Sequence, residues 1–282
     1  MNSDWVGVSA ACAAGLGAGW VAWVVLQPVF GSPVLARRNF RDRELAVGGG
    51  LALVVAVIGV AAVASAAQVG RSGRGLARAE SALLVVVLGF GLLGFVDDVV
   101  GSGRDRGFRG HLRELSRGRL TAGGLKLFGG GCVAILAVHY AGSASLGALL
   151  RDAALIALCA NLANLFDLAP GRAIKTAAIA GLMLVVATRA DVLLRGVAVV
   201  VGSALGLLWP DLRERLMLGD TGANPLGAAV GLGIVLVCAP STRLIVLAAL
   251  ALLNLASEFV SFSRVIAAVP PLRWFDGVGR LR

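Results

Sequence analysis

The feature that most constrains this chain is a series of long, almost uninterrupted apolar runs. They consist mainly of Ala, Val, Leu and Gly, and most approach the roughly 20 helical residues that cross a hydrocarbon core. Overall, 58% of the residues are hydrophobic, 15% are charged and the mean hydropathy is +0.87. A soluble domain is nearer to half apolar and a quarter charged. The sequence therefore predicts an integral membrane protein.

The apolar runs are expected to be helices. Lipid offers no partners to exposed backbone groups, and no run alternates as a barrel strand does. We predict one all-α membrane domain over 1–282, a polytopic bundle of about nine spans. The expected spans are 5–30, 47–69, 81–96, 125–142, 146–165, 173–188, 192–209, 223–238 and 243–264.

Charge sets the expected orientation in a cell inner (cytoplasmic) membrane. Nothing basic precedes the first span and no convincing cleavage site follows it, so we expect a retained helix with its N-terminus outside. Five segments then face the cytoplasm and carry 19 of the 26 Lys and Arg residues. These segments are 31–46, 97–126, 166–175, 209–222 and the tail from Arg264. The cluster Arg71–Arg78 on the opposite side departs from the positive-inside rule.

We attribute the net charge of +10 to basic residues that orient the protein in the membrane and attract anionic lipids and phosphate ligands. No nucleic acid partner is expected. The four cysteines lie singly in apolar spans without metal-ligand spacing, so we expect packing residues: Cys12, Cys132, Cys159 and Cys238.

The first polar site is Asp97-Asp98, at the end of an apolar span. Two neighbouring acids repel each other, and a cation or a shared proton relieves the repulsion. A Mg²⁺-dependent phosphate site and a solvated helix end are equally compatible with the pair. Lys126 follows where the chain re-enters the membrane. The basic residues between them are more simply explained as ordinary topogenic charge: Arg104, Arg106, Arg109, His111, Arg113, Arg117 and Arg119.

Two further polar sites lie on the same expected side. Asn161, Asn164 and Asp167 are spaced three apart, which predicts a polar stripe facing a cavity, with interhelical hydrogen bonding as the alternative. Asp220-Thr221 opens a later span, where the acid is either a helix cap or a metal ligand. Because all three sites fall on one predicted side, we favour a functional interpretation of them.

Together these motifs resemble the polyprenyl-phosphate N-acetylhexosamine-1-phosphate transferase superfamily, whose members include phospho-N-acetylmuramoyl-pentapeptide transferase. The shared elements are Asp97-Asp98 after an apolar span, Asn-x-x-Asn-x-x-Asp, and Gly-Asp-Thr-Gly opening a helix, in this order and with similar separations. The likeness is clearest over 94–227. It extends to the glycines 48–50 and to a tail, 259–279, that is similar to the family's last cytoplasmic loop.

The resemblance implies transfer of a sugar-1-phosphate from a UDP-sugar to polyprenyl phosphate with release of UMP, in cell-envelope glycan synthesis. It implies Mg²⁺, or Mn²⁺ in its place, held by Asn164 and Asp220, with Asp98 near the metal. Asp97 would orient or deprotonate the lipid phosphate and Lys126 would meet the phosphates. Asn161 and Asp167 would belong to the nucleotide-sugar pocket. The expected partners are the two substrates and membrane lipids, and a homodimer is left open.

Three departures from the family pattern bear on the substrate. Gly101 stands where members often have a basic residue, Pro170 where the muramoyl-pentapeptide type has an acid, and the tail lacks the family's histidine cluster. We therefore disfavour a muramoyl-pentapeptide substrate. Two alternatives to the enzyme remain. One is a catalytically silent relative that binds the lipid carrier or a partner enzyme, and the less favoured one is an ion- or proton-coupled transporter.

Overall fold

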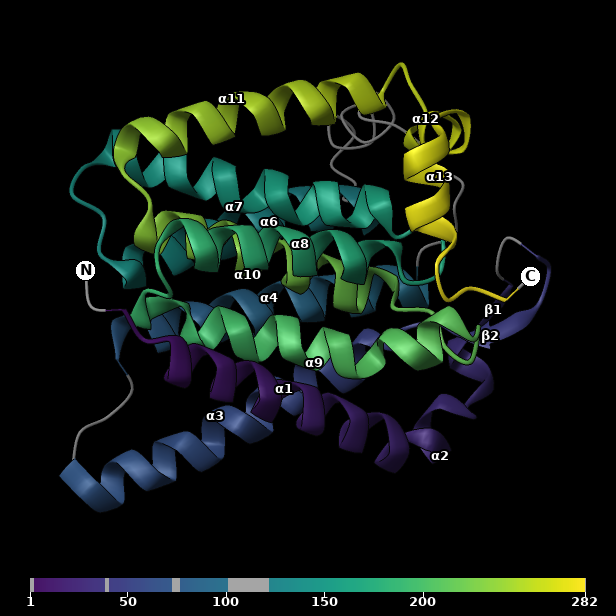
Figure 1. Ribbon diagram of the computed structural model, residues 1–282, viewed down its shortest axis with the longest axis horizontal. Coiled ribbons are helices and arrows are strands. Elements are labelled where there is room, and N and C mark those ends of the chain that lie inside the picture. Colours follow the sequence, from purple (N-terminus) through teal and green to yellow (C-terminus); the bar gives the residue numbers. More distant parts are fainter. Residues whose placement is uncertain (1–2, 39–40, 73–76, 101–121, 282) are drawn as a thin grey trace.

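The computed structural model describes residues 3–38, 41–72, 77–100 and 122–281, and Figure 1 shows them as long helices lying side by side. The long helices are α1 (Trp5–Val25), α3 (Gly50–Ser72), α4 (Arg78–Val100), α6 (Ala122–Ala141), α7 (Leu146–Phe166), α8 (Arg172–Ala187), α9 (Arg195–Leu212), α10 (Gly219–Val237) and α11 (Pro240–Ser257). The short elements are α2 (Gln27–Phe30), η1 (Pro33–Leu35), η2 (Val192–Leu194), α12 (Phe262–Ala268), α13 (Pro270–Gly277) and the antiparallel strands β1 (Ala36–Arg38) and β2 (Glu44–Ala46).

Among the described residues, eight helices are long and apolar enough to cross a membrane. This confirms the expected all-α, multi-pass membrane bundle in outline. The expected span 173–188 forms α8, whose 16 residues make it shorter than those eight. Many large apolar side chains remain exposed on the outer helices, for example Val63 on α3 and Ile245 on α11. Such an apolar exterior suits lipid and would be unfavourable in water.

Several expected boundaries differ from the structure. The first expected span divides at Leu26 into α1 and α2, and the last ends with α11 at Ser257 instead of reaching 264. The expected loop 31–46 contains the β1–β2 hairpin, in which Arg37 pairs with Leu45. Helix α10 begins at Gly219, four residues before the expected start at 223. The polar Gly-Asp-Thr-Gly segment is therefore helical, because its surroundings and not its hydropathy decide where the helix begins.

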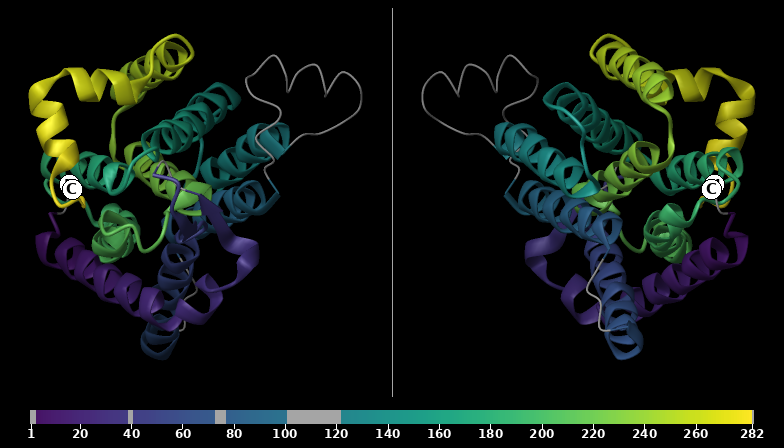
Figure 2. Two further views of the ribbon diagram at one scale, coloured as in Figure 1. Left: turned by 90° about the vertical axis from the view of Figure 1, so that its right-hand side faces the viewer. Right: turned by 90° about the vertical axis from the view of Figure 1, so that its left-hand side faces the viewer.

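Helix α10 is the central helix of the bundle. It packs against α3, α4, α6, α7, α8 and α9, and Figure 2 shows it enclosed by its neighbours. Its small residues allow these close approaches: a Cβ added at Gly227 would lie 2.4 Å from the backbone oxygen of Cys159 on α7. The position of α10 therefore fixes what its first turn can contact.

The connections gather at two ends of the bundle. One end carries α12, α13, the β1–β2 hairpin and the chain's C-terminus, on the right of Figure 1, and the N-terminus lies at the other end. Successive long helices run alternately between the two ends. The end of α4, the start of α6, the end of α7 and the start of α10 therefore come together at the hairpin end.

Candidate active site at the hairpin end of the bundle

Two short segments, at the start of α3 and near the end of α4, hold the start of α10 in place at the hairpin end. The backbone amides of Gly49 and Gly50 donate to the carbonyls of Met217 and Leu218, at 2.9 Å each. A Cβ at Gly50 would lie 2.0 Å from the amide nitrogen of Gly222, and one at Gly94 would lie 2.2 Å from the carbonyl oxygen of Asp220. Helices α3 and α4 therefore approach the first turn of α10 so closely that only glycine fits at these two positions.

Lys126, Asn164 and Asp220 form the centre of the site. The ammonium group of Lys126 donates to Asp220 Oδ2. With the Asn164 amide oriented so that its nitrogen faces Asp220, it donates to Asp220 Oδ1 at 2.6 Å, and its oxygen accepts from Lys126 Nζ at 2.7 Å. Three helices, α6, α7 and α10, thus each contribute one member of a closed hydrogen-bonded triad.

Asp97 lies against this triad from α4. Its Oδ2 is 3.9 Å from Lys126 Nζ, and its carboxyl group interacts directly with that of Asp220. The side chains of Lys126, Asp97 and Asp220 are 19%, 27% and 19% exposed, so the group is largely shielded but still reachable from outside. Two acids in contact beside one lysine carry a net negative charge, which a further cation would offset.

Asp98 has a different role from its neighbour. Its Oδ1 accepts from the backbone amide of Asp220 at 3.0 Å, and its Oδ2 accepts from the amide and the hydroxyl of Thr221 at 2.9 and 2.6 Å. These are the first amides of α10, which have no partner within the helix. Asp98 therefore caps α10 from another helix, and it lies beside the triad without a contact to Lys126.

This arrangement decides one alternative that the sequence left open. Asp220 is the second residue of α10, the capping position is Leu218, and Asp98 supplies the capping carboxylate. The interpretation of Asp220 as a helix cap is therefore wrong. Its carboxylate faces Lys126 and Asn164 instead.

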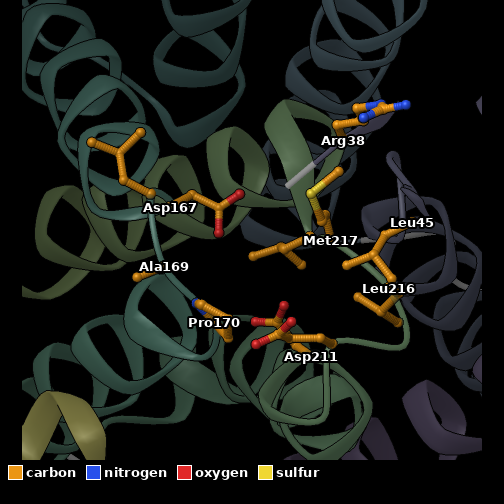
Figure 3. Close-up of a pocket in the computed structure, with 11 residues that line it drawn as sticks. Arg38, Leu45, Asp167, Ala169, Pro170, Asp211, Leu216 and Met217 are labelled. Atoms are coloured by element: carbon orange, nitrogen blue, oxygen red, sulfur yellow. The ribbon is translucent and has the colours of Figure 1, made fainter. Parts of the chain in front are cut away.

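Asp167 lies beside the triad, at the end of α7, and lines a cavity of about 250 Å³. Figure 3 shows its carboxyl group pointing into the space that also receives Asp211. Burial raises the pKa of Asp167 well above its usual range, and the negative charges of Asp211, Asp220 and Asp98 add to this effect. The cavity can therefore take a polar group beside the triad, and Asp167 is a carboxyl that readily holds a proton.

Asn161 is not part of this arrangement. Its amide nitrogen donates to the side-chain oxygen of Asn254 on α11, at 2.7 Å. A helix turns about 100° per residue, so positions three apart drift by about 60°, and six residues separate Asn161 from Asp167 by about 120°. The interhelical hydrogen bond, which the sequence left as the alternative for this stripe, is what the structure places at Asn161.

The structure adds acidic and basic residues that sequence reasoning did not single out. The buried carboxylate of Asp211 accepts from the backbone amide of Gly171 at 2.7 Å and so fixes the turn between α7 and α8. Asp211 lies near the end of an apolar helix. An acid in that position is itself a sequence signal for a functional or structural polar site. Arg38 and Glu214 also line the cavity.

The C-terminal tail packs onto the same turn. Arg172, at the start of α8, forms two hydrogen bonds with Asp276 of α13, at 2.8 and 2.9 Å, and Arg280 binds the same carboxylate. Lys175 donates to three backbone carbonyls at the end of α13, the shortest bond being 2.7 Å to Val278. Burial alone would raise the pKa of Asp276, but the hydrogen bonds from Arg172 and Arg280 outweigh burial and lower it.

The oxygen donors at the triad are of the kind that Mg²⁺ uses. Among the described residues, no three His, Cys, Asp or Glu side chains are grouped so as to form a complete metal site. Mg²⁺, however, commonly takes only one or two carboxylates and completes its octahedron with water and substrate phosphates. Asp220, Asp97 and the amide oxygen of Asn164 fit such a partial set. The basic stretch Arg104–Arg119 and Gly101 lie outside the described residues.

Comparison with known proteins adds no assignment, because no protein-family model matches this chain and no curated protein matches it significantly.

Proposed function

We propose that this protein transfers a sugar-1-phosphate, with N-acetylhexosamine-1-phosphate the expected group, from a UDP-sugar to polyprenyl phosphate and releases UMP. The observation that carries the proposal is the convergence of Asp97, Lys126, Asn164 and Asp220 from four helices at one end of an apolar bundle. These residues are far apart in the sequence, and simple topogenic charge does not require them to meet. A phosphoryl-transfer site needs this combination of cation, carboxylates and shielding from water.

The proposed reaction exchanges one phosphoanhydride bond for another. An oxygen of the lipid phosphate attacks the phosphorus attached to the sugar, the bond from that phosphorus to the bridging oxygen breaks, and UMP leaves with the bridging oxygen. Asp97 orients the lipid phosphate and accepts its proton when the phosphate enters protonated. Lys126 contacts the phosphate oxygens on which negative charge builds up. Because no protein atom bonds to the substrate, positioning and charge neutralisation supply most of the rate.

Asn164 and Asp220 would hold the Mg²⁺, or Mn²⁺, which would supply positive charge to the pyrophosphate. Lys126 donates to both residues, and we propose that its ammonium group also contacts the substrate phosphates. Asp98 keeps Asp220 in position through the first amides of α10. Asp167 contributes to the nucleotide-sugar pocket through the cavity that it lines.

With this function we also propose a membrane arrangement. The hairpin end faces the cytoplasm, and α8 crosses the membrane as a ninth span. A UDP-sugar is soluble and strongly charged, so it reaches the site from the aqueous side. The lipid phosphate arrives through the bilayer, with its apolar chain among the exposed apolar helices. A site at one end of the bundle suits both routes, whereas a transporter is expected to bind near the midplane.

The test is an assay of the purified full-length protein with a panel of UDP-sugars, undecaprenyl or decaprenyl phosphate and Mg²⁺, with UMP release as the readout. We expect release with at least one donor and loss of release in Asp220→Asn. Asp191→Asn makes the same chemical change at the opposite end and should leave the rate unchanged. Absence of UMP release across the whole panel would favour a catalytically silent relative. Pro170 and the histidine-free tail are the features that support that second candidate.

A further inference from the structure

A second polar cavity lies at the end of the bundle opposite Asp220. It has a volume of about 460 Å³ and is formed by the start of α4, the α6–α7 turn, the end of α10 and the start of α11. These segments lie toward the N-terminal end of the bundle in Figure 1. The function proposed above does not use this cavity.

A buried carboxylate organises one wall of the cavity. The side chain of Asp152 is only 3% exposed, and it accepts from Arg151 at 2.7 and 3.0 Å and from Arg243 Nη1 at 2.8 Å. Arg243 is fixed further by a bond from its Nε to the carbonyl of Cys238 at 2.8 Å. Two guanidinium groups, from α7 and α11, are therefore held in set orientations by one acid.

A third arginine lines the cavity from another helix. Arg78, at the start of α4, is exposed and reaches toward the α6–α7 turn, where its Nη1 would lie 3.8 Å from a Cβ added at Gly142. Among the described residues its side chain forms no hydrogen bond or ion pair. Of the described residues that line the cavity, three are arginines and one is an acid, which leaves a net charge of +2.

An ion-pair anchor between α7 and α11 would account for Asp152 and Arg243 alone. It would not account for the open volume or for Arg78, whose guanidinium faces the same space from another helix. A pocket with two excess guanidinium groups is expected to attract an anion, and the guanidinium fork matches phosphate oxygens in particular. The remaining wall is partly apolar, including Val138 and Leu236, as suits the region where lipid headgroups meet acyl chains.

We propose that this cavity binds a phosphate-bearing anion and that its source is the headgroup of an anionic phospholipid. The site lies where helices end, so a headgroup can enter from the membrane surface while its acyl chains stay beside the apolar helices. Basic pockets between helices on the cytoplasmic side of membranes bind anionic headgroups, and we propose that the same combination of charge and depth acts at this end of the bundle. Binding of an anion would also explain why these arginines lie at the end expected to face outside, where the positive-inside rule predicts few basic residues.

The test is native mass spectrometry of the purified full-length protein, titrated with dioleoyl phosphatidylglycerol or dioleoyl phosphatidylcholine. We expect the unmodified protein to prefer phosphatidylglycerol and Arg78→Gln to weaken that binding about fivefold, the factor expected from one basic residue near an anionic surface. Arg78→Lys keeps the charge but loses the guanidinium fork, so its binding should lie between that of the unmodified protein and that of Arg78→Gln. Arg189→Gln removes an exposed arginine at the same end but outside the cavity, so it should bind like the unmodified protein.

Inorganic phosphate alone forms the second arm of the experiment. If phosphate binds with the same dependence on Arg78 while the two lipids bind equally, the site takes the free anion and the lipid source is wrong. An equal loss in Arg78→Gln and Arg189→Gln would assign the binding to overall charge and overturn the site. Equal binding of both lipids without any phosphate binding would also overturn it. Each of these results leaves the UMP-release assay unaffected, because that assay concerns the other end of the bundle.

Discussion

The carboxylates of Asp98 and Asp220 lie side by side at the start of α10, but their contacts differ in kind. Asp98 binds the backbone amides of the second and third residues of the helix and the Thr221 hydroxyl. The Asp220 carboxylate, in contrast, is bound by the side chains of Lys126 and Asn164. An amide can replace one of the two accepting oxygens of a carboxylate, but it cannot replace the full negative charge that a metal requires.

Asparagine substitutions should therefore separate these two acids. We expect Asp98→Asn to reduce UMP release by about tenfold, because its amide oxygen replaces only one of the two accepting oxygens and its NH₂ group would face a donor at the start of α10. Asp220→Asn should reduce release by about 10²–10³, the usual effect of losing electrostatic stabilisation at a reacting centre. The two rates, measured at equal amounts of folded protein, check this. Comparable losses in both variants would assign Asp98 to the metal or the substrate directly.

Asp167 should make the free energy of unfolding depend on pH. Its folded-state pKa is raised, so the carboxyl is protonated in both states below its ordinary pKa, and stability is lost as the pH rises from there through the folded-state value. Asp167→Asn removes this loss. We expect the variant to unfold at a higher temperature than the parent at neutral pH and at the same temperature in acid. A constant difference at every pH would mean that ionisation is not the cause.

At the scale of elements, glycine seams set how closely the helices approach. Helix α1 packs along α9 so tightly that a Cβ at Gly15 would lie 2.2 Å from the carbonyl oxygen of Val199, and one at Gly202 would lie 2.1 Å from that of Cys12. Such contacts between backbones, with glycines four apart on both helices, are a common way in which membrane helices associate. The seam holds α9, and the turn after α9 leads directly into the first turn of α10.

Two glycines on the same helix provide a matched test of this seam. Gly15→Ala should destabilise the protein by about 1–3 kcal/mol, because the added methyl group meets backbone that cannot move aside locally. Gly17→Ala places its methyl group where no atom lies within 4 Å, so helix propensity should make it neutral or stabilising by up to about 1 kcal/mol. Thermal unfolding of both variants in one detergent measures the difference. Similar unfolding temperatures would show that α1 is not tightly held against α9.

At the scale of the whole molecule, the two ends of the bundle have different chemistry. The hairpin end carries the triad, the acidic cavity and the clamp between Arg172 and Asp276, whereas the other end carries the arginine-lined cavity. Under the two proposals above, both substrates would bind at the hairpin end, and an anionic phospholipid would bind at the other end. Orientation in the membrane decides which end faces the nucleotide pool.

Cysteine labelling in intact cells should establish that orientation. In a variant without the four native cysteines, Ser143→Cys marks the α6–α7 turn and Ser261→Cys marks the start of α12. We expect a membrane-impermeant maleimide to label the first from outside and to label the second only after the membrane is opened. The reverse pattern would place the triad outside the cell, away from UDP-sugars, and would contradict the proposed function.

The sequence alone was enough to predict a multi-pass helical membrane bundle and to place its acidic motifs at one end. The physical reason is that an apolar span must be a helix of nearly fixed length, so the ends of alternate spans return to the same side. Asp97, Lys126, Asn164 and Asp220 could be selected in this way because a charge or amide near membrane depth needs a local reason to be there.

Only the tertiary structure decided what each polar group contacts. The cap of α10 comes from Asp98 on another helix, 122 residues earlier, and Asn161 turns toward α11, although its spacing had suggested one stripe with Asp167. Neither outcome follows from local periodicity, because helix rotation and interhelical distance depend on packing between segments that are distant in the chain. The glycines at 50 and 94 let α3 and α4 close on the start of α10, and this packing places Asp220 against Lys126 instead of leaving it as a cap.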